Sequence, residues 1–150
     1  MAIAIMLHLL ASVIWVGGMF FAYMALRPVA ASLLEPPQRL PLWSQVFGRF
    51  FPWVWTAVIL LLVTGLWMVK SFGGFGQVGL YIHLMAGLGI VMMLLFAHVF
   101  FAPYRRMKQA LAANDMPEAG RRLAQIRIII GINLTLGLIV TVLATAGKYM

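Results

Sequence analysis

The chain has 150 residues, of which 64% are hydrophobic and 9% are charged, and its mean hydropathy is +1.01. Soluble domains carry about a quarter charged residues, so this composition indicates a single integral membrane domain, residues 1–150. Cysteine is absent, which excludes disulfides, cysteine-ligated zinc and thiolate catalysis. The net charge of +8 does not indicate nucleic-acid binding, because most basic residues lie in two connections between apolar runs and suit contact with lipid headgroups.

The first element is an apolar run, Ile3–Leu26, that is long enough to cross a membrane. No Lys or Arg precedes this run, and it is longer than the apolar core of a signal peptide, so we expect a permanent spanning helix. The run contains His8, and an ionisable side chain inside a bilayer is a candidate for function. Helical spacing predicts one face that carries His8, Ser12, Trp15 and Met19.

Three further uncharged runs have spanning length, and they are Phe50–Val69, Gly79–Ala102 and Ile128–Gly147. Each run is continuously apolar rather than alternating, which favours helices over the strands of a barrel. The sequence therefore predicts an all-α fold, a membrane-embedded four-helix bundle. The expected inward positions are Thr56 and Thr64 in the second span and Asn133, Gly137, Thr141 and Thr145 in the fourth.

The three connections between the spans differ in composition. The first, Arg27 to Arg49, contains Glu35-Pro36-Pro37 and Pro41, and we expect it to be broken and irregular. The second, residues 70–78, is short and glycine-rich. The third is predicted to begin as a helical extension of the third span, to turn at "NDMP" and to resume as a helix at Pro117.

The charge of the connections predicts an orientation. Three basic residues lie in the first connection and six in the third, and these two connections share one side of the membrane. The positive-inside rule then places loops 27–49 and 103–127 in the cytoplasm and both termini on the outer side. We therefore expect a multi-pass protein of a bacterial-type inner membrane.

The depth of the three histidines separates them into a pair and a single residue. His8 and His83 each lie roughly 6–8 Å inside the outer boundary of their spans, at about 1.5 Å per residue. Two imidazoles at one depth could flank a metal centre, so both are candidate metal ligands. His98 lies about 22 Å deeper than His83 and cannot share a metal with this pair. Alternatively, each histidine simply makes a polar contact between helices.

The residues leave the nature of a bound group open. Zinc is disfavoured because no span holds a cysteine or a carboxylate. Copper(I) accepts His and Met, and the chain has 11 Met, although Met is also an ordinary core residue. Haem b needs only axial ligands and an apolar slot, and the small residues Ser12 and Gly87 near the histidines would let a macrocycle approach the helices. No P-loop, hydrolytic triad or carboxylate pair is present.

Two segments carry a resemblance to known families. "HLLASVIWVGGMFF", which begins at His8, resembles the start of the CopD-like membrane proteins and of the related HemJ-like four-helix proteins, whose members oxidise protoporphyrinogen IX. "ALRP" at Ala25–Pro28 is also CopD-like. "YIHLMAGLGIVMMLLFAHVFFAPYRRM" resembles the HemJ pattern, with one His near the start of the third span, another near its end and basic residues after it. The resemblance implies haem b bound by histidine, with His8 the best match and His83 and His98 as further candidates.

The sequence departs from the HemJ pattern at two places. The HemJ pattern has a Lys two residues after the third-span His, where this chain has Met85. An Asn-Glu pair expected at the start of the last span is replaced by "QIRIII" at Gln125–Ile130. These departures weaken the enzyme assignment more than the haem assignment.

The leading hypothesis is an inner-membrane haem b protein that acts in electron transfer or redox chemistry, with His8 and His83 as axial ligands. Its partner would be a quinone, a porphyrinogen or a redox protein. Iron held by two His has no open position and suits electron transfer. His98, with Arg105 and Arg106 within two turns, is a candidate for a second haem or a quinone, although a snorkelling basic end explains it as well.

Three alternatives remain beside this hypothesis. The first is a copper-binding or copper-transport protein of the CopD type that uses His8, His83 and nearby Met residues. The second is a HemJ-type protoporphyrinogen IX oxidase. The third is a structural membrane subunit without a cofactor. Small-residue faces could also pack a second copy of the chain and form a homo-oligomer.

Overall fold

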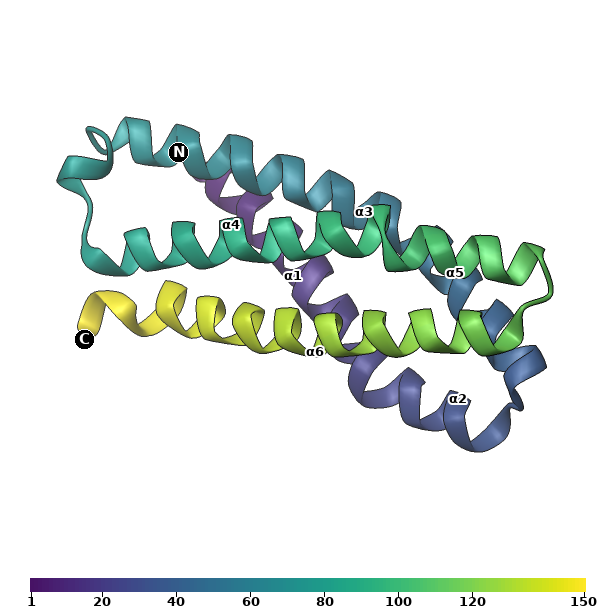
Figure 1. Cartoon of the computed structure of the whole chain (residues 1–150). Coiled ribbons are helices and arrows are strands. Elements are labelled where there is room, and N and C mark those ends of the chain that lie inside the picture. The colour runs from purple at the N-terminus through teal and green to yellow at the C-terminus, as the bar shows by residue number, and fades with distance from the viewer.

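A computed structural model describes all 150 residues as a bundle of long antiparallel helices without strands (Figure 1). Four helical segments are long and apolar enough to cross a membrane, which confirms the predicted all-α bundle of four spans. The elements are α1 (Ala2–Phe21), the π-helical turn η1 (Ala22–Leu26), α2 (Arg27–Leu33), α3 (Pro36–Ser71), the 3-10 turn η2 (Phe75–Gln77), α4 (Leu80–Phe101), α5 (Pro103–Ala112), α6 (Met116–Ala146) and the 3-10 turn η3 (Gly147–Tyr149).

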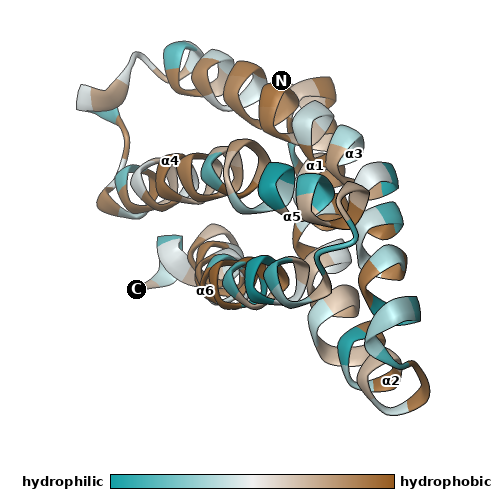
Figure 2. Ribbon diagram, turned by 45° about the vertical axis from the view of Figure 1, so that its right-hand side comes forward, coloured by the Kyte–Doolittle hydropathy of each residue, from teal (hydrophilic) through white to brown (hydrophobic).

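The two ends of the bundle carry different parts of the chain (Figure 1). One end holds both termini and the short glycine-rich connection, and we name it the terminal end. The opposite end holds residues 27–49 and 103–127 with nine of the eleven Lys and Arg, and we name it the basic end. Figure 2 shows hydrophilic residues gathered toward the basic end and apolar residues along the middle of the helices.

The first connection is helical, so the prediction of a broken and irregular segment was wrong. After η1 the chain continues as α2, and only Leu34 and Glu35 separate α2 from α3. Glu35 is extended, with φ −77° and ψ 158°, because a residue before proline avoids the helical region. Pro36 then occupies the first turn of α3, where its missing N–H breaks no helical hydrogen bond. The prolines therefore end one helix and start the next, and Pro41 is accommodated inside α3.

The third connection follows the prediction. The helix breaks at Ala102, with φ −115° and ψ −88°, and resumes as α5 from Pro103. α5 ends in a turn in which Asn114 adopts the left-handed conformation, with φ 57°. Asp115 then caps α6, because its side chain accepts a hydrogen bond from the backbone N–H of Glu118 at 3.2 Å. The extension, the turn and the new helix start are all confirmed.

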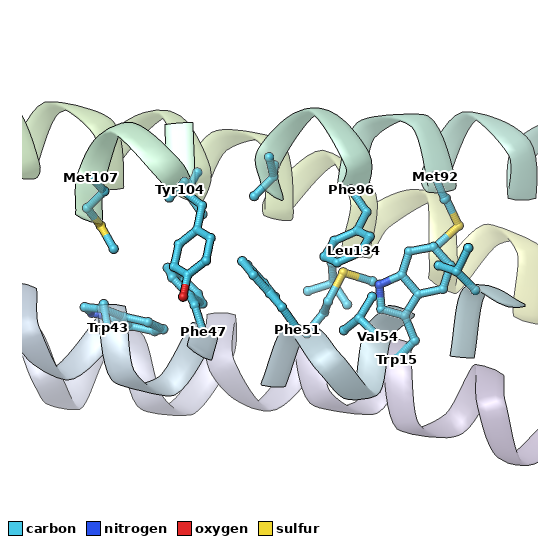
Figure 3. Packing of buried hydrophobic residues seen from close by; sticks show 14 of the residues in the cluster. Trp15, Trp43, Phe47, Phe51, Val54, Met92, Phe96, Tyr104, Met107 and Leu134 are labelled. Atoms are coloured by element: carbon cyan, nitrogen blue, oxygen red, sulfur yellow. The ribbon is translucent and has the colours of Figure 1, made fainter. Parts of the chain in front are cut away.

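Aromatic rings fill the core in the half of the bundle toward the basic end (Figure 3). Phe47 and Phe51 of α3 stack with ring centroids 4.9 Å apart. Tyr104 of α5 meets the Phe51 ring edge-on at 4.9 Å, and Phe96 of α4 meets it at 5.3 Å. Such pairs add to the large apolar area that each ring buries. This stack joins α3 to α4 and α5 across the bundle.

The helices pack mainly in pairs. α1 packs against α3, while α4 and α5 pack against α6, and α3 and α4 make few contacts with each other although they follow one another in the chain. Only 24 of the 150 residues are buried, and large apolar side chains cover the outside, as expected for a protein whose spans face lipid.

The predicted inward faces are correct only in part. Thr64, Asn133 and Gly137 are buried, as predicted. Thr56, Thr141 and Thr145 are exposed, so these three predictions were wrong. Each of these hydroxyls donates to a carbonyl of its own helix four residues earlier, which satisfies a threonine that has no partner on a neighbouring helix.

Candidate functional site

His8 lies on α1 against the part of α3 that is near the terminal end. Its Nδ1 atom is 2.8 Å from Oγ1 of Thr64. The Thr64 hydroxyl donates its proton to the carbonyl oxygen of Leu60 at 2.5 Å, so it can only accept from the imidazole. Nδ1 of His8 therefore carries a proton, and in the neutral imidazole Nε2 is the nitrogen with a free lone pair. Nε2 makes no hydrogen bond within the chain.

The residue next to Thr64 gives the His8 ring its space. A Cβ atom on Gly65 would lie 3.3 Å from Cε1 of His8, which is tighter than ordinary van der Waals contact. Thr64 itself is buried, with 5% of its surface exposed. Two consecutive residues of α3 thus position the imidazole, one by a hydrogen bond and one by having no side chain.

The pairing of His8 with Thr64 and Gly65 was not predicted from the sequence. Thr64 was expected to face inward, but its partner was not identified, and Gly65 was not singled out. Depth carries a usable signal, because His8 lies five residues after the start of Ile3–Leu26 and Thr64 lies five residues before the end of Phe50–Val69, and these two ends of the runs share one end of the bundle. Polar residues at equal depth on neighbouring helices are candidates for a hydrogen bond.

His83 lies near the start of α4 and is exposed. Its Nδ1 is 3.1 Å from the carbonyl oxygen of Gly79, and a carbonyl can only accept, so Nδ1 again carries the proton. In the neutral imidazole, Nε2 of His83 is then the nitrogen with a free lone pair. No hydrogen bond joins His83 to His8, and the two residues belong to different helix pairs, α4 with α6 and α1 with α3. A metal shared between them stays a prediction.

The remaining candidate residues lie in separate places. His98 is exposed and lines a surface cavity of about 320 Å³ with Arg106 and Gln125 at the basic end. Ser12 is half-buried, and its hydroxyl donates to a carbonyl of its own helix. Gly87 is exposed, and a Cβ added to it would meet no atom within 4 Å. A role for these three residues in cofactor binding stays a prediction.

The common metal-ligating side chains are dispersed over the structure. No group of three or more His, Cys, Asp or Glu side chains is positioned to hold a metal ion. Two separate imidazoles, those of His8 and His83, have Nδ1 held by a hydrogen bond and Nε2 without a partner in the chain. A hydrogen bond of this kind orients metal-binding histidines and raises their basicity.

The comparisons with known proteins identify the family. A family profile described as "Copper resistance protein D" matches residues 44–147, more than half of the chain. The chain belongs to the CopD family. The match includes Thr64, Gly65, His83 and His98, while His8 lies ahead of it. Comparisons with curated proteins and with solved structures gave no match.

The CopD assignment confirms one part of the resemblance and leaves another as a prediction. The chain is a multi-pass membrane protein of the copper-resistance type, because its family and its four membrane-length helices agree. The likeness to HemJ and the binding of haem are not part of this match and stay predictions.

Proposed function

We propose that this CopD-family protein handles copper within the membrane and that Nε2 of His8 is a ligand of Cu(I). The observation that carries the proposal is the hydrogen bond from Nδ1 of His8 to Thr64, which leaves Nε2 unprotonated and fixes the ring. The family description, "Copper resistance protein D", supports copper as the cargo.

A thioether is the natural second ligand, because Cu(I) accepts both imidazole and methionine sulfur. Met68 is half-buried and lies one helical turn beyond Thr64 on the same side of α3. We favour copper over zinc as the cargo because no span carries a cysteine or a carboxylate, which zinc sites commonly use. His8 and Met68 would give copper a soft, weakly held site near the terminal end, which suits a protein that passes copper on.

A haem b protein is the second candidate, and one observation favours it. His8 and His83 both have Nδ1 engaged as a donor and Nε2 free, which is the state of an imidazole that serves as an axial ligand. These two residues would hold the haem, which supplies one-electron transfer when bound. A quinone, a porphyrinogen or a redox protein would then be the partner, and porphyrinogen oxidation would be the enzymatic form of this function.

The orientation of the protein is part of the proposal. Nine of the eleven basic residues lie at the basic end, and the positive-inside rule assigns this end to the cytoplasm of a bacterial-type inner membrane. The His8 site then lies near the outer face. Membrane-impermeant labelling of single cysteines introduced at Ser71 and Gln109 tests this, and labelling of Gln109→Cys in intact cells would reverse the orientation.

One experiment separates the two functions. The full chain is purified from cells supplied with both haem and copper, and its absorption spectrum and its copper content are measured before and after dithionite reduction. We expect the purified protein to be colourless and to contain Cu(I). The His8→Ala variant should contain no copper. The His98→Ala variant, the matched control at the other end of the bundle, should contain as much copper as the unchanged protein. A Soret band with sharp reduced bands, lost in His8→Ala, would replace copper by haem. Absence of both groups, or retention of copper in His8→Ala, would overturn the assignment of His8.

A further inference from the structure

A second cavity lies at the basic end, and nothing in the proposed function uses it. Its volume is about 290 Å³, and it is lined by residues at the junction of η1 with α2, in the first turns of α3, and in α6. Three arginines line it, one from each of these parts of the chain: Arg27, Arg39 and Arg127. The rest of the wall is mostly apolar and includes the rings of Tyr23 and Trp43. The cavity therefore combines a concentrated positive charge with an apolar surface.

The three arginines have no acidic partner in the chain. The only ion pairs join Arg121 and Arg122 to Glu118, which does not line the cavity. Concentrating three guanidinium groups around one space without a carboxylate is electrostatically unfavourable unless an anion enters. Arginine at such a place is suited to phosphate, because its planar fork donates two parallel hydrogen bonds to phosphate oxygens.

Much of the donor capacity of these arginines is unused by the protein. Nε of Arg27 donates to the carbonyl of Tyr23 at 3.3 Å, and its guanidinium lies 4.4 Å over the Tyr23 ring. Arg39 makes one long hydrogen bond, at 3.5 Å, to the carbonyl of Leu34. Arg127 makes no hydrogen bond within the chain and forms no ion pair. Most of the fifteen N–H groups that three guanidinium groups carry are thus free for a ligand.

The fold positions this cavity through close packing. The π-helical turn η1 ends the first span and carries Tyr23. The Tyr23 ring packs closely against Gly131 of α6. A Cβ at Gly131 would lie only 3.1 Å from Cε2 of Tyr23, so a residue with a side chain there would crowd the ring. Arg27 stacks on that ring. One wall of the cavity is therefore fixed against α6, and π-helical turns of this kind are frequent at functional sites.

The position of the cavity along the bundle matches the level of lipid headgroups. Arg27 directly follows the apolar run of the first span, and Arg127 directly precedes that of the fourth. Arg39 lines the same cavity from the start of α3, ahead of the apolar run of the second span. Basic pockets between spanning helices at this level bind anionic headgroups.

We propose that this cavity binds a phosphate group and that the group belongs to the headgroup of an anionic membrane lipid. The arginines bind the phosphate, and the aromatic and apolar wall packs against the glycerol and the first carbons of the acyl chains. A free phosphate ion would use the arginines but would leave the apolar wall without a function. The site lies at the opposite end from His8, so the proposal does not depend on copper or haem.

The test titrates the full chain in detergent with phosphatidylglycerol, with phosphatidylcholine and with inorganic phosphate, and reads bound ligand by native mass spectrometry. We expect one phosphatidylglycerol per chain at concentrations where the other two do not bind. Arg39→Gln and Arg127→Gln should each weaken this binding about tenfold or more, which is the usual cost of losing a hydrogen bond to a charged group. Arg49→Gln and Arg105→Gln, exposed arginines of the same end outside the cavity, are controls of equal charge and should leave binding unchanged.

A second variant separates a defined site from diffuse attraction. Gly120 lines the cavity, and a Cβ added to it meets no atom within 4 Å, so Gly120→Leu should fill the cavity without disturbing the fold or the charge. We expect it to abolish lipid binding. The proposed site would be overturned if the Arg39 and Arg127 variants and the Arg49 and Arg105 controls lost lipid affinity equally while Gly120→Leu still bound the lipid. If inorganic phosphate binds as tightly as the lipid, the cavity is a phosphate site, but the phosphate group does not need to come from a lipid.

Discussion

Toward the basic end, stacked aromatic rings from α3, α4 and α5 form a continuous core, whereas toward the terminal end α1, α3, α4 and α6 bury almost nothing. No buried residue lies before Ala11 in α1, beyond Thr64 in α3, before Met92 in α4 or beyond Gly137 in α6. His8 and His83 both lie in this weakly packed half. The packing that stabilises the fold therefore lies mainly in the half toward the basic end. The half toward the terminal end holds two histidines whose Nε2 atoms have no partner in the chain.

The largest expected difference between the halves comes from a pair of phenylalanines. Phe51 has 3% of its surface exposed and contacts several rings, while Phe72 is 53% exposed near the terminal end. We expect Phe51→Ala to lower the free energy of unfolding by about 3–5 kcal/mol, because it leaves a cavity in the core. Phe72→Ala should have almost no effect. Denaturant unfolding in detergent, followed by circular dichroism, measures the free energy of unfolding of both variants. An equal decrease in the two variants would show that the halves contribute equally to stability.

Two glycines give the next largest contrast. A Cβ on Gly137 would lie 2.9 Å from a methyl group of Val16 and 3.1 Å from the terminal carbon of Met92, whereas Gly87 faces open space. Gly137→Val should therefore lower the free energy of unfolding by about 1–3 kcal/mol, because the added side chain overpacks this part of the core. Gly87→Ala should instead stabilise the helix by about 0.5–1 kcal/mol. The melting temperatures of the two variants measure this, and a destabilised Gly87→Ala would mean that the α4 face is covered in the native protein.

Thr64 connects the two halves, because it is the buried residue of α3 nearest the terminal end and the partner of His8. Thr64→Val should lower the free energy of unfolding by about 0.5–1.5 kcal/mol. The same change should weaken metal binding by about 10–100-fold, since Nδ1 of His8 loses its orienting partner. Thr56→Val, an exposed threonine of the same helix, is the control. Titration with Cu(I) against a competing chelator measures the affinity. If Thr64→Val binds Cu(I) as tightly as the unchanged protein, the hydrogen bond between His8 and Thr64 does not contribute to metal binding.

The smallest expected effect lies at the surface of the basic end. Asp115 accepts a hydrogen bond from the first turn of α6 at 3.2 Å. Asp115→Ala should lower the free energy of unfolding by about 1 kcal/mol, and Asp115→Asn should retain most of the cap. Chemical unfolding of both variants measures the difference. A loss in Asp115→Asn as large as in Asp115→Ala would show that the carboxylate charge, rather than the cap, matters here.

The spans and the helix restart at Asp115 could be predicted because lipid requires long apolar helices and because a capping residue before proline is a local signal. The first connection could not, since Pro36 is compatible both with a loop and with the first turn of a helix, and only the continuation of α3 decides between them. His8 could be given a depth from its span. Its contact with Thr64 and Gly65 depends on how α1 turns about its own axis, which a weakly amphipathic apolar helix does not reveal.

The length of α3 has a consequence for whatever meets this protein outside the membrane. At about 1.5 Å per residue, a helix from Pro36 to Ser71 extends about 54 Å. The hydrocarbon core of a bilayer is only about 30 Å thick. With Phe50–Val69 in the hydrocarbon, the segment Pro36–Arg49 stands roughly 20 Å beyond it as continuous helix. A soluble molecule that approaches this face therefore meets a rigid platform that is already formed, and its docking costs little ordering entropy.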